Sequence, residues 1–273
     1  MDIPDEFDVC IYHKRCMDGY FAAAAVLEHS PNVALIAAQY GDEPPACAGS
    51  RVVIVDFSYL RAVLEELYET CESLLVLDHH ATAEEALRGL DYAIFDQEES
   101  GASLTWKHLH NELPKVVSYV RDRDLWKWQL EDSRAVSAAL AVDIESPEDA
   151  LEEVMLFNKE DQANSGNAIL LAQQKRVERI ARQAFLAVVE VGKSTLDVIA
   201  CCAATDQSEV GSKLAAEHGK PAVLFYRAAE KPLWRYSVRS TDDTFAASEI
   251  AEAYGGGGHR NAAGFAAHTL LFP

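Results

Sequence analysis

The chain has 273 residues, of which 49% are hydrophobic and 25% are charged, and its formal net charge at pH 7 is -20. The negative charge lies in the first part of the chain. Residues 1–163 contain 12 Lys and Arg against 33 Asp and Glu, whereas residues 164–273 contain 12 against 11. A surface this acidic repels a long polyanion, which excludes non-specific binding of long duplex nucleic acid. A short anionic substrate stays compatible with this charge if a few fixed cations or metal ions hold it.

Three features of the sequence predict a cytoplasmic protein without membrane association. No apolar run approaches the ~20 residues that a helix needs to cross a bilayer. The N-terminal residues 1–6 are acidic, whereas a signal peptide begins with basic residues. The six cysteines show no Cys-x-x-Cys spacing, and free thiols of this kind are typical of a reducing compartment.

The chain opens with the pattern of a doubly wound α/β domain. Residues 8–12 are predicted to form a buried strand, the polar segment 13–19 a tight turn, and the Ala-rich residues 20–28 a helix. Residues 33–38 predict a second strand. A strand, a polar turn and a helix in this order form the first unit of a doubly wound sheet.

Three further apolar runs each end at a side chain that can bind a metal ion or a proton: residues 51–55 at Asp56, residues 74–77 at Asp78-His79-His80, and residues 92–95 at Asp96. Residues 59–71 have the apolar spacing of an amphipathic helix, and a second helix is predicted to begin at Gly101. Strands that alternate with helices indicate a mainly parallel sheet with helices on both faces.

The carboxyl ends of parallel strands meet at one edge of a sheet, so the polar residues that follow these strands are expected to lie together. They include His13, Asp18, Asp56 and the triplet 78–80. Mixed nitrogen and oxygen ligands without a cysteine cluster suit Mn²⁺, Mg²⁺, Fe²⁺ or Zn²⁺. A carboxylate such as Asp56 can bridge two ions, and two ions roughly 3.5–4 Å apart activate a water and stabilise charge in phosphoryl transfer.

The order of these motifs resembles that of the DHH phosphoesterase superfamily. The triplet that names the family stands here as Asp78-His79-His80, while residues 13–19 are similar to its first motif and Asp56 to its second. Residues 122–126, Asp-Arg-Asp-Leu-Trp, fall where a fourth, acidic motif is expected. The Cys-x-Asp-Gly form of the first motif is most similar to the branch of oligoribonuclease-like phosphodiesterases of the nano-RNase type. Exopolyphosphatases and RecJ-like exonucleases are more distant.

The far end of the chain carries a second signature of the same family. Residues 255–265 resemble the glycine-rich segment of the DHH-associated C-terminal domain. Glycines let backbone N–H groups approach a phosphate closely, and the histidine and arginine that follow them add donors and charge. The implied substrate contacts are Arg239, Ser240, Gly256, Gly257, Gly258, His259 and Arg260.

The resemblance implies a hydrolase with two divalent metal ions, most often Mn²⁺, with Mg²⁺ or Fe²⁺ as alternatives. The implied ligands are His13 for the first ion, Asp18 and His79 for the second, and Asp56 as the bridge. His80 would lie beside the leaving oxygen as a proton donor or electrostatic stabiliser. Asp78 would orient an imidazole and fix its tautomer.

Two details of the implied metal site stay open in the sequence. Many relatives carry an aspartate where this chain has Cys16, so Cys16 is either a soft metal ligand or a buried thiol that binds nothing. The fourth-motif ligand is Asp122 or Asp124, with Asp96 as a weaker third choice. Asp122 is preferred because an apolar segment leads into it and Trp126 then falls where relatives carry an aromatic residue.

The pair Trp126 and Trp128 has two interpretations. Aromatic faces stack on the bases of single-stranded nucleotides. Two aromatic residues two positions apart in an extended segment also point to the same side, as the buried face of a strand requires. The second interpretation is the more common one for such a pair.

The second half of the chain predicts a helix and a smaller domain. Residues 163–191 lack proline and predict one long helix with an interruption only near Gly166. After it, strands are predicted at 196–201, 222–226 and 234–239, and helices at 208–218 and 245–254. The predicted fold is α/β: a mainly parallel doubly wound catalytic domain (1–162), a helical connector (163–192) and a DHH-associated substrate-binding domain (193–273), with the active site in the cleft between the two domains.

The main hypothesis is a metal-dependent phosphodiesterase that hydrolyses short oligonucleotides or linear dinucleotides to mononucleotides. One alternative is a small-molecule phosphatase that acts on 3′-phosphoadenosine 5′-phosphate or a short polyphosphate. A catalytically weak nucleotide-binding regulatory protein is the alternative outside the enzymes. The expected partner is a short single-stranded oligonucleotide or nucleotide, without long duplex nucleic acid or a membrane, and a homodimer is a further hypothesis.

Overall fold

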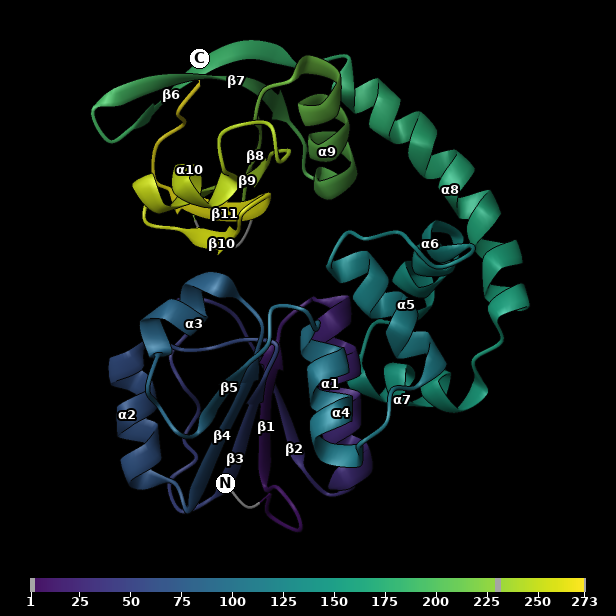
Figure 1. Cartoon of the computed structure of the whole chain (residues 1–273), viewed down its shortest axis with the longest axis vertical. Coiled ribbons are helices and arrows are strands. Elements are labelled where there is room, and N and C mark those ends of the chain that lie inside the picture. Colours follow the sequence, from purple (N-terminus) through teal and green to yellow (C-terminus); the bar gives the residue numbers. More distant parts are fainter. Residues whose placement is uncertain (1–2, 229–231, 273) are drawn as a thin grey trace. The chain divides into compact units, whose positions relative to one another are not determined.

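The computed structural model describes residues 3–228 and 232–272 (Figure 1). The chain separates into two compact units, Met1–Leu170 and Leu171–Pro273, and the boundary falls within helix α8 (Lys159–Ala181). Each unit contains a sheet of its own. None of the helices in the described ranges combines the length and apolar character that crossing a bilayer requires.

The first unit is built on a five-stranded parallel sheet with the strand order β2-β1-β3-β4-β5. Its strands are β1 (Val9–His13), β2 (Ala34–Ala38), β3 (Arg51–Val55), β4 (Ser73–Asp78) and β5 (Ala93–Phe95). Its helices are α1 (Met17–His29), α2 (Arg61–Thr70), α3 (Ala81–Leu87), α4 (Gly101–His110), α5 (Lys115–Asp124), α6 (Ser133–Asp143) and α7 (Pro147–Leu156), followed by the first part of α8. In this order β1, β3 and β4 are neighbours, so their carboxyl ends meet at one edge.

The central strands are buried on both faces of the sheet. Along β3, Val53 and Val55 pack into one hydrophobic cluster while Val52 and Ile54 pack into another, as the two-residue period of a strand requires. Helices α1 and α4 cover the first face, and α2 and α3 cover the second (Figure 1). Burial on both faces explains why these strands read as continuous apolar runs rather than as alternating ones.

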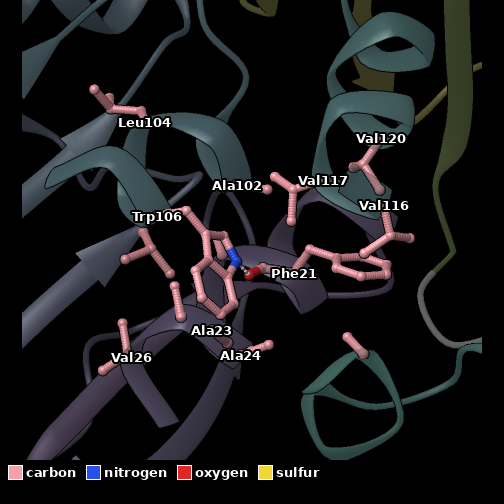
Figure 2. Packing of buried hydrophobic residues seen from close by; sticks show 14 of the residues in the cluster. Phe21, Ala23, Ala24, Val26, Ala102, Leu104, Trp106, Val116, Val117 and Val120 are labelled. Atoms are coloured by element: carbon pink, nitrogen blue, oxygen red, sulfur yellow. Dashed lines mark hydrogen bonds between the residues drawn. The ribbon is translucent and has the colours of Figure 1, made fainter. Parts of the chain in front are cut away.

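The core on the α1 side fixes where the first motif lies. Phe21 of α1 is fully buried and packs with Val116, Val117 and Val120 of α5 (Figure 2). Trp106 of α4 is also fully buried, and its indole Nε1–H donates a hydrogen bond of 3.0 Å to the carbonyl oxygen of Phe21. A buried tryptophan needs such a partner, and the bond ties α4 to α1.

The prediction that Trp126 and Trp128 lie in an extended segment is wrong. They follow the end of α5 with φ angles of +55° and +53°, in the left-handed region. Their rings meet at 4.9 Å with an interplanar angle of 72°, and the guanidinium of Arg134 lies 4.2 Å from the ring centre of Trp128. The two rings therefore form a bent aromatic turn and not one face of a strand.

The second unit is a mixed sheet with the strand order β10-β11-β9-β8-β7-β6, in which only β7 and β8 are parallel among the strands of the described residues. Helix α10 packs on one face, and α9 with the last part of α8 packs on the other. The elements are β6 (Phe185–Val191), β7 (Ser194–Cys202), α9 (Gln207–His218), β8 (Ala222–Arg227), β9 (Trp234–Arg239), α10 (Ala247–Ala253), β10 (Gly257–His259) and β11 (Ala262–Ala267). The α/β fold class and the two sheet domains are as the sequence predicts.

The prediction of one helix over residues 163–191 is wrong at its end and at its middle. Helix α8 stops at Ala181, and residues 185–191 form strand β6, paired antiparallel with β7. No glycine or proline marks this boundary, and the short turn that makes it is built from ordinary residues. The sequence Phe-Leu-Ala-Val-Val-Glu-Val is rich in β-branched residues, which favour a strand. Gly166 does not interrupt the helix.

Gly166 instead lets α8 contact α6 closely. A Cβ atom at this position would lie 1.7 Å from the carbonyl oxygen of Ala135, which belongs to the backbone of α6. We expect Gly166→Ala to lower the free energy of unfolding by about 1–3 kcal/mol, because the overpacking outweighs the gain in helix propensity. Ser165→Ala, at an exposed neighbouring position of the same helix, is the control and should be neutral or slightly stabilising. Urea unfolding of both variants checks this, and equal stability of the two would contradict a close contact.

Candidate metal centre

The ends of three neighbouring strands bring the predicted site residues together. Strand β1 ends at His13, β3 is followed directly by Asp56, and β4 ends at Asp78 with His79 and His80 next in the chain. The first turn of α1 adds Asp18, with Cys16 at its N-cap. The last residue of α5 is Asp124.

Asp56 lies at the centre of this group. Its Oδ2 is 3.4 Å from His13 Nδ1, and its Oδ1 is 3.2 Å from His79 Nε2. The residue is 1% exposed and has a left-handed φ of +56°. A Cβ atom at Gly101, the first residue of α4, would lie 2.5 Å from the Asp56 Cβ. A glycine at this position is therefore what allows Asp56 to turn in against the start of α4.

A second carboxylate group surrounds His79. The Nε2 atom of His79 is 3.8 Å from Asp18 Oδ2 and 3.6 Å from Asp124 Oδ2. The backbone N–H of Ala102, at the N-terminus of α4, donates a hydrogen bond of 3.1 Å to Asp18 Oδ1. The positive end of the helix thus faces one of the acids.

Two of the groups of potential ligand atoms among the described residues contain the predicted metal ligands, and Asp56 contacts a histidine of each. His13, Cys16 and Asp56 form one set, and Asp18, His79 and Asp124 form the other; the ligand atoms of each set lie within 4.8 Å of one another. Three of these atoms, His13 Nδ1, Asp18 Oδ2 and Asp56 Oδ2, are buried and have no hydrogen-bond partner among the described residues. Buried polar atoms without a partner are costly, and a divalent cation would satisfy them. Nitrogen and carboxylate donors of this kind fit Mn²⁺, Fe²⁺, Mg²⁺ or Zn²⁺.

The crowding of acids shifts their protonation. Burial and the charges of Asp56 and Asp124 raise the pKa of Asp18 well above its usual range. Burial also opposes ionisation of Asp56, but contacts with His13 and His79 hold its pKa well below the usual range. Burial alone would lower the pKa of His79, whereas its hydrogen bond to Asp56 and the charges of Asp124 and Asp56 raise it to about 10. In the metal-free protein, protons therefore take up part of the charge that a cation would neutralise.

Asp78 belongs to a further group of potential ligands, with Asp56, His79 and His80, but its carboxylate already has several hydrogen-bond partners. It is fully buried, accepts a hydrogen bond from the Ser58 hydroxyl at 2.5 Å, and accepts the backbone N–H of His79 at 2.7 Å. Its Oδ1 is also 2.7 Å from His80 Nδ1. An ionised Asp78 can only accept, so Nδ1 of His80 carries the proton in this pair. Burial favours the neutral form of both groups, but their contact outweighs it. His80 lowers the pKa of Asp78, and Asp78 raises the pKa of His80.

The acids of the fourth motif lie in three different environments. The Asp124 carboxylate faces His79, as described above. The carboxylate of Asp122 points to the following loop, where it accepts the backbone N–H groups of Gln129 at 2.9 Å and Leu130 at 3.2 Å. Asp96 is exposed and accepts the backbone N–H of Glu98 at 2.9 Å. The geometry therefore favours Asp124 over Asp122, which the sequence placed first, and over Asp96.

Cys16 lies where the sequence left its role open. Its sulfur belongs to the set with His13 and Asp56. Burial and the charges of Asp56 and Asp18 raise the pKa of the thiol well above its usual range. A thiol that keeps its proton is a poor ligand for a hard cation, so the third donor of this set is the weakest one.

Two residues at this edge were missed in the sequence. Ser58 follows β3 by three positions and holds Asp78, and Tyr40 follows β2 by two positions and lies near His13 and His80. Both stand in the short segment after a strand of the same sheet. That position is the one signal in the sequence that could have pointed to them.

The predicted substrate residues lie together at one end of the second unit's sheet. Arg239 ends β9 and is the register partner of Ala262 in β11. The Ser240 hydroxyl donates to the carbonyl oxygen of Arg260 at 3.2 Å and accepts the backbone N–H of Ala247 at 3.1 Å. This links the end of β9, the hairpin turn and the start of α10.

The polar groups of this cluster have partners within the unit. Arg239 donates to the hydroxyls of Ser237 at 3.0 Å and Ser208 at 2.8 Å, and Arg260 donates to the carbonyl oxygen of Asp242 at 3.0 Å. His259 ends β10, directly before the hairpin turn. These contacts fix the side chains that were expected to bind phosphate.

The glycine run leads into the hairpin of β10 and β11. A Cβ atom at Gly256 would lie 2.1 Å from the carbonyl oxygen of Gly264, and one at Gly258 would lie 2.6 Å from that of Ala262. Gly257 pairs with Gly264 in the ladder. Close packing of the hairpin thus accounts for glycine at two of these positions, beside the predicted role in phosphate binding.

Comparisons with known proteins agree with this architecture. The DHHA1 domain family model matches residues 198–270, which begin within β7 and extend past the end of β11. Over 288 residues the chain is 27% identical to Uncharacterized protein R106 of Acanthamoeba polyphaga mimivirus, and the match covers 96% of this chain and 68% of that protein.

Two solved structures share the fold. One is RecJ in complex with Mn²⁺ from Thermus thermophilus, at 16% identity and a TM-score of 0.52, covering 97% of this chain and 50% of that one. The other is an exopolyphosphatase-related protein from Bacteroides fragilis, at 13% identity and a TM-score of 0.51, covering 98% and 88%. Residues 198–270 thus match the DHHA1 domain family, and the chain shares its fold with these two structures and carries the Asp78-His79-His80 triplet at the end of β4.

Proposed function

We propose that the chain is a metal-dependent phosphodiesterase that hydrolyses short oligonucleotides or linear dinucleotides to mononucleotides. The observation that carries the proposal is the pair of ligand sets that share the edge of one sheet, with the two oxygens of Asp56 directed to His13 and to His79. A carboxylate placed in this way suits a bridge between two cations.

His13, Asp56 and, more weakly, Cys16 would hold one divalent ion, and Asp18, Asp56, His79 and Asp124 would hold the other. Mn²⁺ is the favoured ion because the donors are imidazoles and carboxylates, with Mg²⁺ and Fe²⁺ as alternatives. The structure of RecJ from Thermus thermophilus, which shares the fold of this chain, was solved in complex with Mn²⁺. When bound, such ions lower the pKa of a water and neutralise charge that develops on the phosphoryl group.

The pair of Asp78 and His80 supplies a proton at the same edge. Asp78 orients the imidazole through Nδ1 and stabilises its protonated form, which suits His80 to donate a proton to the leaving oxygen. Ser58 and the backbone N–H of His79 keep Asp78 in place. Asp78 therefore acts by positioning His80.

Charge and the second unit support a short substrate. The surplus of acid in residues 1–163 disfavours a long polyanion, whereas the balanced charge of residues 164–273 suits binding of a terminal phosphate. The proposed contacts are the backbone N–H groups of residues 257 and 258 and the side chains of Arg239, Ser240, His259 and Arg260. The predicted contact through Gly256 is not proposed, because its N–H donates to the carbonyl oxygen of Ala251 at 2.9 Å. A cytoplasmic location and a homodimer stay predictions.

The activity itself is tested with purified protein, Mn²⁺ and three substrates: a labelled dinucleotide, 3′-phosphoadenosine 5′-phosphate and a short polyphosphate. We expect hydrolysis of the dinucleotide, and a drop in kcat of about 10²- to 10⁴-fold in His80→Gln, because a positioned proton donor is lost. His218→Gln, at an exposed position on α9, is the control. Hydrolysis of one of the other two substrates alone would favour the small-molecule phosphatase, and absence of turnover on all three would leave only a nucleotide-binding protein.

The choice between Asp124 and Asp122 gives a second prediction. Asp124→Asn should reduce bound Mn²⁺ by about one ion per chain, because a ligand of the second set is weakened. Asp122→Asn should keep the metal but lower the free energy of unfolding by about 1–3 kcal/mol, because an amide cannot accept both N–H groups of residues 129 and 130. Metal content by mass spectrometry and urea unfolding in EDTA separate the two. The reverse pattern would assign the site to Asp122.

The raised pKa of His79 and Asp18 predicts that protons compete with the metal. Since the pKa of His79 is about 10 without metal, the imidazole must lose a proton before it can bind a cation. The apparent affinity for Mn²⁺ should therefore rise with pH across the neutral range, by roughly tenfold per pH unit for each proton displaced. Calorimetric titrations at several pH values measure this slope. His79→Gln should lower the number of protons displaced by Mn²⁺ by about one, which reduces the slope of affinity with pH. An unchanged slope in this variant would contradict the assignment of His79 as a metal ligand.

A further inference from the structure

An aromatic ring stands beside the proposed metal ligands without being part of them. Tyr40 is 52% exposed, although its ring centre lies 5.9 Å from that of His13, 6.0 Å from that of His80 and 5.2 Å from that of Phe57. The interplanar angles are 75°, 83° and 68° in the same order. The ring meets all three neighbours at steep angles and stacks on none of them, and about half of the side chain is exposed to solvent.

The position of Tyr40 is fixed by its turn. It is the second residue of a four-residue turn, in which the backbone N–H of Asp42 donates to the carbonyl oxygen of Gln39 at 3.0 Å. The Asp42 carboxylate in return accepts the N–H of Gln39 at 3.2 Å. Just before the turn, the N–H of Lys14 donates to the carbonyl oxygen of Ala38 at 2.8 Å, which ties this segment to β1.

The Phe57 ring that contacts Tyr40 is itself packed against other aromatic rings. Phe57 is fully buried, and its ring meets that of Tyr59 at 4.8 Å. It also lies close to parallel with the His13 imidazole, at 6.2 Å and 25°. Tyr40 therefore contacts a packed group of aromatic rings while about half of its side chain is exposed.

Tyr68 shows that exposure alone does not create an open face. It is 51% exposed, on α2, but its ring stacks on Tyr92 at 4.3 Å and 13°. The contact satisfies one face of Tyr68 within the fold. Tyr40 has a nearly equal exposure but no such stacking partner among the described residues, and it lies beside His80 instead.

We propose that Tyr40 is a stacking platform for the nucleobase of the nucleotide whose phosphate lies at the metal ligands. The inference rests on the proposed function and narrows it, because an open aromatic face beside the reacting group favours substrates with a base over a polyphosphate. Stacking on a fixed aromatic ring is tolerant of base identity. The platform thus selects nucleotides as a class and not one sequence.

The test is a binding measurement that needs no turnover. Calorimetric titrations of the Mn²⁺-loaded protein with AMP and with ribose 5-phosphate give the preference for a ligand that carries a base. We expect the wild type to prefer AMP by about 5- to 150-fold, the ratio that a stacking energy of ~1–3 kcal/mol gives. Tyr40→Ala should reduce this preference to within about twofold of equal affinity. Tyr40→Phe should keep the preference of the wild type, because the ring remains.

Tyr68→Ala is the matched control and should keep the preference of the wild type. An equal affinity of the wild type for both ligands, or a preference that survives in Tyr40→Ala, would overturn the platform. Loss of the preference in Tyr40→Phe would do so as well, because the hydroxyl and not the ring would then be responsible. Failure of the hydrolysis assay would leave this binding result intact, so the two proposals can fail separately.

Discussion

The first unit depends on the gathering of three carboxylates, two of them buried, around the imidazole of His79. All three lie 3.2–3.8 Å from His79 Nε2, and Asp18 and Asp56 are each 1% exposed. Carboxylates gathered around one side chain raise the free energy of a folded protein unless a proton or a cation offsets their charge. The rest of the unit serves to hold these groups together in spite of that cost.

The means of holding them are visible in the backbone. The carboxylates come from a loop after β3 and from the ends of two helices, so no single element could bring them together. The parallel order of β1, β3 and β4 sets the distances between strand ends, while the hydrogen bond from Trp106 to Phe21 joins α4 to α1. Gly101 then allows Asp56 to approach the start of α4, where the helix also donates a hydrogen bond to Asp18. A cation at this edge would be bound by elements that the core already fixes.

The sequence predicts the parts of this arrangement that depend on local pattern. Apolar runs that stop at Asp56 and at Asp78 mark strands buried on both faces, because only such strands lack alternation. The choice of Asp122 over Asp124 depends on how α5 is rotated and where it ends, and a two-residue shift along a helix changes the direction of a side chain by about 200°. Tertiary packing decides that rotation. Strand β6 was assigned to a helix because its start carries neither glycine nor proline.

The acidity of the first unit is compatible with an anionic substrate, because repulsion from the acidic surface and attraction by cations at the site act over different distances. Repulsion from a broadly negative surface extends over about a Debye length, roughly 8–10 Å in physiological salt, and so acts on every phosphate of a long chain. Attraction by cations at the proposed metal site would act only on the phosphate that reaches them. A substrate with one or two phosphates gains the second interaction and suffers little of the first, whereas each further nucleotide adds repulsion. An aromatic ring such as Tyr40 would add affinity without adding positive charge, so the proposed binding of a nucleotide is compatible with the repulsion of a long nucleic acid.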